Sequence, residues 1–368
     1  MSPDKPTKPD IGMVSKQMLR AKIEIIKRKS GLNSLKDSND LKTWYTNIHQ
    51  KHTYTFMQWD FDQYYPSISK NLLLKAIEHA KKYVEFTEWE VNIVLQARKS
   101  VLTHQDQPWT KKGDEPFDVT MGAYDGAEVC ELVGLYVLSL LAALPYGKAV
   151  QYRDDGLMII KGSSRQAEVK KKEVAAILKS TGIGITISAN LKRVDFLDLT
   201  LDLDLGTYQI FNKPNNIPLY VHKQSSHPPN VTRNIASGIN KRLSSNCSNE
   251  ELFKIGTPIF QQALKNSGHN HELKFEQENP RTKSKTSRKQ IVIYFNPAWA
   301  DNVKTKVGTK ILNLGKESFS TSNPLHTLFN KNTIEVSYST TPNIGQIIIS
   351  HNRKLLPKLS PKVEEPCT

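Results

Sequence analysis

Two adjacent acids, Asp154 and Asp155, stand between short apolar runs, and this arrangement constrains the fold more than any other stretch of the chain. The runs at 149–150 and 157–160 predict the two strands of a β-hairpin with both acids at its tip. If a third carboxylate joins them, unit charges about 4 Å apart repel by roughly 4 kcal/mol per pair at an effective dielectric near 20, so the cluster requires a cation. Carboxylate oxygens favour Mg²⁺ or Mn²⁺. Taken alone, the pattern is more typical of an acidic surface turn.

Asp60 is the candidate for this third carboxylate, because it stands at the end of a second predicted strand. β-branched and aromatic residues fill 53–61, and a helix capped by Ser69 is expected over 70–83. A two-metal site for phosphoryl transfer needs carboxylates from separate elements. Asp60 and the acids of the hairpin meet that need, which favours a metal site over a surface turn.

The order of the predicted elements indicates the fold class. Strands alternate with connections of helical length, which predicts a sheet covered by helices on one face, an α+β sandwich. The expected helices span 11–30, 70–83, 87–102, 125–144 and 165–180, and the expected strands lie at 53–61, around the hairpin, at 185–187 and over 196–211 with a turn at 204–207. Asp125 could cap the fourth helix, and a further hairpin is expected over 109–120 with its turn at 112–114.

The second half of the chain predicts smaller units. Helices are expected over 231–243 and 250–265, the second with a capping box of Ser248 and Glu251 and a stop at Gly268. The segment 281–289 contains five basic residues and no acid. A last α/β unit is expected from strands at 291–295, 333–337 and 346–350 and a helix over 302–314.

Charge and composition indicate which classes of binding partner and cellular location to expect. The chain has 51 Lys and Arg residues against 36 Asp and Glu, a formal net charge of +15, which favours nucleic acid over a membrane surface, with a merely basic solvated surface as the alternative. The three cysteines lie too far apart in sequence to indicate a zinc site or a disulfide framework. The apolar stretch 132–144 is too short for a membrane span, and no signal peptide is evident. We therefore expect an intracellular protein, nuclear or cytoplasmic.

Several motifs in the same order resemble those of reverse transcriptases. Residues 59–68 (Trp59-Asp60-Phe61-Asp62-Gln63-Tyr64-Tyr65-Pro66-Ser67-Ile68) resemble the first palm motif, and Tyr152-Arg153-Asp154-Asp155 resembles the Tyr-x-Asp-Asp motif. Met121-Gly122 is similar to the motif that contacts the incoming base pair, Asn190-Leu191-Lys192 to the following lysine motif, and 196–199 to the primer-grip hairpin. Further segments at 213–216, 220, 226–229 and 240–242 are similar to the Penelope-like group of retroelements.

This resemblance covers roughly residues 50–265 and implies the architecture of a right-hand polymerase. It implies an α+β palm, an antiparallel sheet backed by helices, with truncated fingers and a helical thumb. The expected regions are partial fingers at 1–50, palm at 51–211, thumb-like helices at 212–268, a basic linker at 269–289, a small α/β unit at 290–352 and a loose tail at 353–368.

The resemblance also implies roles for single residues. Tyr65 would lie under the sugar and exclude a 2′-hydroxyl, with simple core packing as the alternative, and Lys192 could donate a proton to pyrophosphate or neutralise it. RNA template, DNA primer and deoxynucleoside triphosphate are the implied partners, with no membrane. The implied sites are catalytic and metal-binding Asp60, Asp154 and Asp155 with two Mg²⁺ or Mn²⁺ ions, nucleotide-binding Phe61, Tyr65, Gly122 and Lys192, and nucleic-acid-binding Phe196, Leu197, Lys213, Lys241 and Arg242.

The sequence also departs from the family pattern. Residues 125–128 (Asp125-Gly126-Ala127-Glu128) replace the usual Ser-Pro and add negative charge near the nucleotide site, unless Glu128 only packs a helix turn. The fingers, which in the family hold the triphosphate, are short, and no Gly-Ile-Tyr…Tyr-Ile-Gly nuclease pattern is found. We therefore expect the chain to bind primer–template and to extend it poorly or not at all.

Three hypotheses remain. The first is an RNA-directed DNA polymerase of a mobile element, and the second is a decayed copy that keeps the palm and binds nucleic acid without catalysis. The third, an RNA-dependent RNA polymerase, is disfavoured because Tyr65 would obstruct ribonucleotides.

Overall fold

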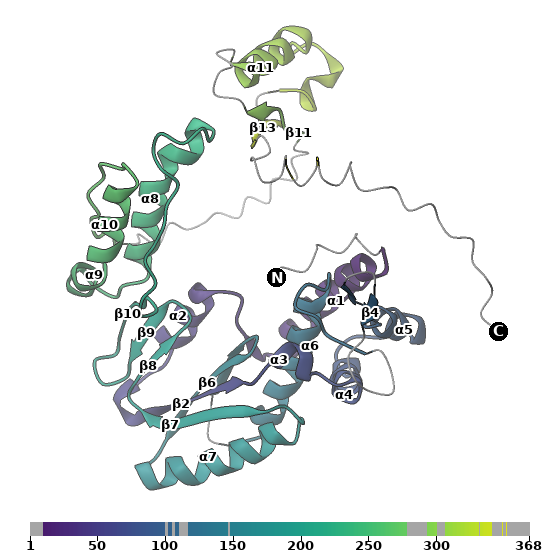
Figure 1. Ribbon diagram of the computed structural model, residues 1–368, viewed down its shortest axis with the longest axis vertical. Coiled ribbons are helices and arrows are strands. Elements are labelled where there is room, and N and C mark those ends of the chain that lie inside the picture. Colours follow the sequence, from purple (N-terminus) through teal and green to yellow (C-terminus); the bar gives the residue numbers. More distant parts are fainter. Residues whose placement is uncertain are drawn as a thin grey trace, which may run out of the picture. The chain divides into compact units, whose positions relative to one another are not determined.

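The structure is a computed structural model that describes residues 10–99, 102–104, 107–109, 117–145, 148–277, 293–299, 306–330, 332–340, 348 and 351. The chain divides into two compact units. The first comprises Met1–Pro214 with Asn246–Gly256, and the second comprises Asn215–Ser245 with Thr257–Thr368. Figure 1 traces both along the sequence. All three candidate carboxylates belong to the first unit.

A five-stranded sheet is the centre of the first unit. Neighbouring strands are antiparallel except at one edge, where the two-residue β1 runs parallel to β5. The α+β class is thereby confirmed, but the sheet is mixed rather than wholly antiparallel. The strand order is β1 (Asn33–Ser34), β5 (Lys148–Tyr152), β6 (Asp155–Lys161), β2 (Tyr54–Phe61) and β7 (Ile185–Leu191).

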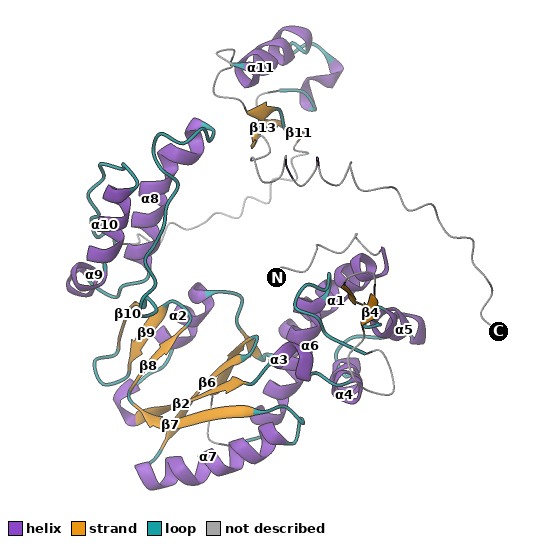
Figure 2. Cartoon of the chain, in the orientation of Figure 1, coloured by secondary structure: helices purple, strands orange, loops and turns teal. Residues whose placement is uncertain are grey.

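Helices cover one face of this sheet (Figure 2). Side chains alternate between the two faces of a strand, and Met57, Trp59 and Phe61 of β2 lie in one core cluster with Met158 and Ile160 of β6. The helices that complete the cluster pack against this face of the sheet. They are α1 (Asp10–Ser30), α4 (Lys70–Lys81), α5 (Glu88–Gln96), α6 (Gly126–Ala142) and α7 (Ser164–Lys179), and the short α3 (Tyr64–Ser67) follows β2.

A second core covers one end of the other face. Phe56, Leu157 and Ile159 are buried there with Tyr45 and Phe196. The covering elements are α2 (Ser38–Thr46) and a three-stranded antiparallel sheet of β8 (Arg193–Phe196), β9 (Leu199–Asp202) and β10 (Thr207–Ile210), with β9 in the middle. At the other end of the face Asp60 is exposed. The fold therefore presents the end of β2 that carries Asp60 to solvent.

Local sequence signals decide most helix ends. Ser69 caps α4 as predicted, and a capping box of Thr87 and Glu90 begins α5. The expected box of Ser248 is wrong, because its hydroxyl accepts from the Tyr208 amide at 2.5 Å and donates to the Tyr208 carbonyl at 2.8 Å. The single helix expected over 250–265 is two, α9 (Glu250–Gly256) and α10 (Pro258–Asn266), because proline has no amide hydrogen and favours a first turn.

The second unit contains α8 (Pro229–Ser245) and α10. The buried amide of Asn240 donates to Glu276 at 2.7 Å and accepts from the Lys274 amide at 2.8 Å, which ties the segment after α10 to α8. Later elements are β11 (Ile293–Phe295) paired with β13 (Ile334–Val336), β12 (Ala298–Trp299) paired with β14 (Ser339–Thr340), and α11 (Val307–Ser318).

Some expectations fall on residues that the structure does not describe. They are the turn at 112–114, the basic segment 281–289, most of the strand at 346–350 and the tail at 353–368. Near the first of these, β3 (Leu102–His104) pairs with β4 (Gln107–Trp109). Within the described part of the chain, no helix has both the length and the apolar character that crossing a membrane requires.

Candidate active site

Three carboxylates meet where β2 ends and β6 begins. Asp60 stands directly opposite Asp155 in the β2–β6 register, so both side chains leave the same face of the sheet. Asp154 lies in the hairpin turn, and its main-chain carbonyl accepts from the Phe61 amide at 3.2 Å. The structure therefore brings together the three acids that the sequence indicated.

The electrostatics of this carboxylate cluster favour a bound cation. Burial, with the charges of Asp154 and Asp60, raises the pKa of Asp155 to about 6, and Lys213 partly offsets the increase. Burial, with Asp154 and Asp62, also raises the pKa of Asp60. A divalent cation would relieve this repulsion, and an oxygen-only donor set suits Mg²⁺ or Mn²⁺.

The donor set is small. Among the described residues, no three His, Cys, Asp or Glu side chains are grouped closely enough to hold one ion. Mg²⁺ is commonly held by one or two carboxylates together with water and substrate phosphates. The facing pair Asp60 and Asp155, with Asp154 beside them, fits that kind of site.

Arg153 gives the hairpin turn an unusual residue. It is the first of the two residues between the paired Tyr152 and Asp155, and its φ is +53°. Two-residue hairpins need such a left-handed residue, which is normally glycine or asparagine and costs other residues about 1–2 kcal/mol. The exposed guanidinium of Arg153 lies over the Tyr152 ring, 5.3 Å from its centroid.

Gly156 lies behind the carboxylate cluster, on the helix-covered face of the β2–β6 pair, and this role was not predicted from the sequence. It faces Trp59 across the β2–β6 pair, and a Cβ at Gly156 would lie 1.8 Å from the indole ring. Trp59 is 1% exposed and cannot withdraw. The available signal was a glycine inside a predicted strand, which often marks such a close approach.

Tyr65 adjoins the cluster, whereas Phe61 supports it from within. The Phe61 side chain is buried and stacks on Tyr64 with ring centroids 5.2 Å apart, and the Tyr64 hydroxyl donates to the Cys130 carbonyl at 3.0 Å. Tyr65 is half-buried, and burial, then Cys130 and Asp154, raises its pKa. Tyr65 is therefore placed to contact a ligand, and the Phe61 ring is not.

Lys192 lies away from the cluster. Its ammonium group donates to the carbonyls of His52 at 2.7 Å and Tyr54 at 2.9 Å, and it pairs with Asp204 at 3.2 Å. Tyr54 and Asp60 are at opposite ends of β2, about 20 Å apart at roughly 3.3 Å per residue. The structure does not bring Lys192 to the carboxylates, because β7 runs antiparallel to β2 and ends at the far end.

The other residues predicted to bind nucleotide or nucleic acid lie in separate parts of the chain. Phe196 is 2% exposed in the second core, and Leu197 occupies the β8–β9 turn with a φ of +55°. Gly122 lies in an exposed turn before α6, where a Cβ would meet no atom within 4 Å. Lys241 and Arg242 are exposed near the end of α8, in the second unit. Of the predicted nucleic-acid contacts, only Lys213 has an electrostatic effect on the cluster.

Asp125 was expected to cap α6 and to add negative charge near the nucleotide site, and the structure shows a different role. Its buried carboxylate accepts from the guanidinium of Arg98 and from the hydroxyl of Ser15, and makes no cap hydrogen bond. Burial lowers the pKa of Arg98 to about 10. Through Ser15 and Arg98, the Asp125 carboxylate joins α1, the end of α5 and the start of α6. Arg98 was not predicted from the sequence because its partner Asp125 is 27 residues away.

The chain resembles solved RNA-templated polymerases weakly. No protein-family model and no curated protein matches it. Telomerase from Candida albicans, in complex with a TWJ fragment of telomeric RNA, is 12% identical with a TM-score of 0.48 over 71% of this chain and 48% of that one. Apo telomerase from Candida tropicalis is 10% identical, with a TM-score of 0.44 over 71% and 52%.

The RNA-dependent RNA polymerase of a human picobirnavirus is similar to the same degree. It is 11% identical, with a TM-score of 0.42 over 70% of this chain and 54% of that one. The chain spans about half the length of these solved structures. Likeness of this degree assigns neither a family nor an activity, so a functional argument depends on the carboxylate cluster itself.

Proposed function

We propose that the chain carries the palm of an RNA-directed DNA polymerase of a mobile genetic element and performs two-metal nucleotidyl transfer. The observation that carries the proposal is the direct pairing of Asp60 with Asp155 at an exposed sheet end, with Asp154 in the adjoining turn. A purely structural turn gains nothing from three acids when burial and mutual repulsion raise the pKa of two of them.

The residues of the cluster have distinct roles in this proposal. Asp60, Asp154 and Asp155 would hold the ions together, with Asp155 assisting Asp60 and Asp154. When bound, two such ions activate the attacking 3′-hydroxyl and stabilise the leaving pyrophosphate. Trp59 and Gly156 keep the two strands in register, so the carboxylates are positioned before substrate arrives.

The remaining contacts concern substrate choice and binding. Tyr65 would lie under the sugar of the incoming nucleotide and exclude a 2′-hydroxyl, which favours deoxynucleotides. Lys213 is exposed beside the cluster and would contact nucleic-acid phosphate, as would Lys241 and Arg242 on α8. The motifs shared with the Penelope-like group support a retroelement origin. RNA template, DNA primer and deoxynucleoside triphosphate are the proposed partners.

A second function, nucleic-acid binding without catalysis, is favoured by one observation. Lys192, which could neutralise the leaving pyrophosphate, is held instead by backbone carbonyls of His52 and Tyr54 at the far end of β2. A decayed copy could keep the fold and the basic surface while losing chemistry, because phosphate contacts do not depend on the metal site.

Binding and extension measured side by side distinguish these two functions. An RNA template annealed to a DNA primer is offered to the chain with Mg²⁺ or Mn²⁺, and hybrid binding and primer extension are followed in the same samples. Metal-dependent extension supports the polymerase. Tight binding with no extension under either metal supports the second function, and absence of binding contradicts both.

A further inference from the structure

A cavity of about 330 Å³ lies beside the hairpin in the first unit. Its walls come from α1, the first turns of α6, the segment around β1 and the end of β5. Gln151, in the wall, lies on the helix-covered side of β5, because it alternates with Tyr152, which faces Asp155 across the strand pair. Tyr152 and Arg153 of the hairpin also line the cavity, but Asp60, Asp154 and Asp155 do not. The proposed chemistry of the carboxylate cluster therefore does not account for the cavity.

Two buried acceptors in the cavity wall have no hydrogen-bond partner among the described residues. They are one carboxylate oxygen of Glu128, whose residue is 8% exposed, and the amide oxygen of Gln151, which is 2% exposed. The Gln151 amide nitrogen donates to the Arg153 carbonyl at 2.7 Å, which fixes the amide oxygen as the free end. Unmatched buried acceptors are costly, and both would be satisfied by a ligand that donates hydrogen bonds.

The charges around the cavity suggest an anionic second part of the ligand. Two of its acids are already paired: Glu24 with Lys36 at 3.0 Å, and Glu131 with Lys27. Arg20 and Arg153 also line the cavity and are exposed, and neither forms an ion pair within 4 Å with any described residue. Arg20 has an electrostatic effect on the Glu24 carboxylate, and Arg153 lies over the Tyr152 ring, 5.3 Å from its centroid. Neither contact is a bidentate ion pair, so both guanidinium groups are suited to bind phosphate.

We propose that this cavity binds a nucleotide whose base carries an exocyclic amino group. The amino group donates to Glu128 and Gln151, and the phosphate pairs with Arg20 and Arg153. The volume lies at the lower end of the range for small-ligand sites, which suits a single nucleotide. The ligand can be a free nucleotide or an unpaired nucleotide of an RNA strand, since both present the same groups. Binding needs no metal and none of the catalytic acids.

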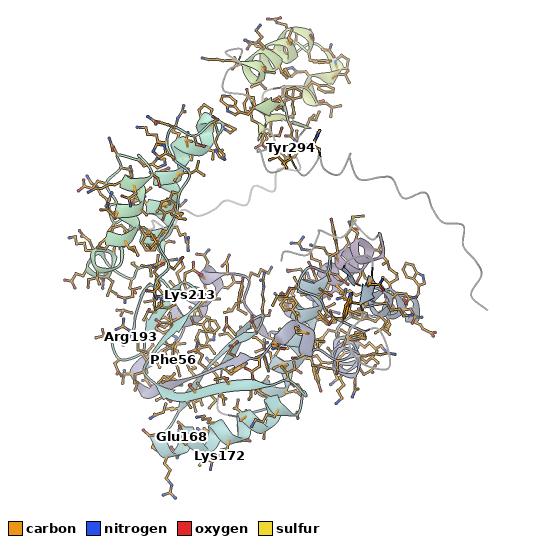
Figure 3. The ribbon with its side chains drawn as sticks, in the orientation of Figure 1. Phe56, Glu168, Lys172, Arg193, Lys213 and Tyr294 are labelled. Carbon is orange, nitrogen blue, oxygen red and sulfur yellow. The ribbon has the colours of Figure 1, made fainter. Side chains whose placement is uncertain are left out.

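Cytidine and uridine monophosphates form a matched pair for the test, because their bases have the same size and differ only in the 4-amino group with N3 as an acceptor against the 4-carbonyl group with N3–H as a donor. Calorimetric titration in EDTA should show CMP binding at least about tenfold more tightly than UMP, since a charged acceptor prefers a donor strongly. Glu128→Gln should remove this preference, because an amide can satisfy either base. Glu168→Gln on α7 is the control and should keep it (Figure 3).

Arg153→Gly tests the phosphate contact without harming the turn. Glycine relieves the left-handed conformation, so weaker binding cannot result from a strained hairpin. We expect CMP and UMP binding to weaken by a similar factor of about ten, with the base preference unchanged. Thermal melting confirms that each variant is folded.

Short oligonucleotides of C or U identify the source of the nucleotide. Equal affinity for CMP and oligo-C indicates a free nucleotide, and much tighter oligo-C binding with the same sensitivity to Glu128→Gln indicates a strand. Absence of any C-over-U preference in both forms overturns the proposal, as does a preference that Glu128→Gln leaves intact. These results are independent of primer extension, so failure here does not count against the proposed polymerase.

Discussion

Asp155 shows how one residue links the fold to the proposed chemistry. It is half-buried and faces Asp60, and both features favour its neutral form. The sequence was sufficient to predict that Asp60, Asp154 and Asp155 lie together, because strand ends and acid spacing are local patterns, and their catalytic role stays a prediction. It was not sufficient for Lys192 or Phe196, whose positions depend on strand register and on burial under α2.

The pH dependence of stability follows from the raised pKa of Asp155. The folded state holds the proton more tightly than the unfolded state, so this stabilisation is present below about pH 4 and is lost as pH rises through about 6. Asp155→Asn should therefore be more stable than the wild type above pH 6, by about 1 kcal/mol after allowance for solvent screening.

Urea unfolding in EDTA at pH 5 and pH 8 measures this difference. The advantage of the variant should shrink at pH 5, and Mg²⁺ at pH 8 should restore stability to the wild type alone. An advantage that is equal at both pH values would contradict the raised pKa.

A substitution at Tyr65 tests whether this residue selects between ribonucleotides and deoxynucleotides. If its ring blocks a 2′-hydroxyl, Tyr65→Val should increase ribonucleotide use relative to deoxynucleotide use by about tenfold. Single-nucleotide incorporation with each substrate gives the ratio. Tyr64→Phe is the matched control, because it loses only the hydroxyl contact to the Cys130 carbonyl. An unchanged ratio in Tyr65→Val would mean that Tyr65 serves packing only.

At the scale of elements, the pair of β2 with β6 decides where the carboxylates lie. The sequence predicted both strands and the hairpin, and it predicted α4 and α7 nearly to the residue, because apolar spacing and capping residues are local. It did not predict the contact of Trp59 with Gly156, or the break between α9 and α10. Each depends on a neighbour in space or on a single proline inside an otherwise helical pattern.

Gly156→Ala should destabilise the pairing of β2 with β6. The added methyl group meets the buried indole of Trp59, and overpacking of this kind costs about 2–3 kcal/mol. Metal-dependent activity should fall with stability, since Asp155 is adjacent. Gly122→Ala is the control, because its methyl group would meet no atom within 4 Å and should change stability by less than about 0.5 kcal/mol. Equal urea midpoints for the two variants would refute the close approach.

At the scale of the whole molecule, the net charge of +15 favours a polyanionic partner. Binding of an RNA–DNA hybrid should weaken steeply with salt, with a log–log slope that changes by about 0.9 for each phosphate contact. Lys213→Ala, Lys241→Ala and Arg242→Ala should each flatten the slope by about one, whereas Lys172→Ala on α7 should not. Filter binding over a salt series measures the slopes, and a uniform slope across all four variants would exclude these contacts.

Single-nucleotide incorporation by matched variants tests the central claim most directly. The wild type, Asp60→Asn, Asp155→Asn and Glu168→Gln are compared on one RNA template and DNA primer with Mg²⁺ or Mn²⁺. If the paired carboxylates hold the catalytic ions, the wild type and Glu168→Gln incorporate the nucleotide. Both aspartate variants should then lose at least about a thousandfold in rate. Undiminished incorporation by Asp60→Asn or Asp155→Asn would contradict the account, whereas a wild type that binds the hybrid and incorporates nothing would favour binding without catalysis.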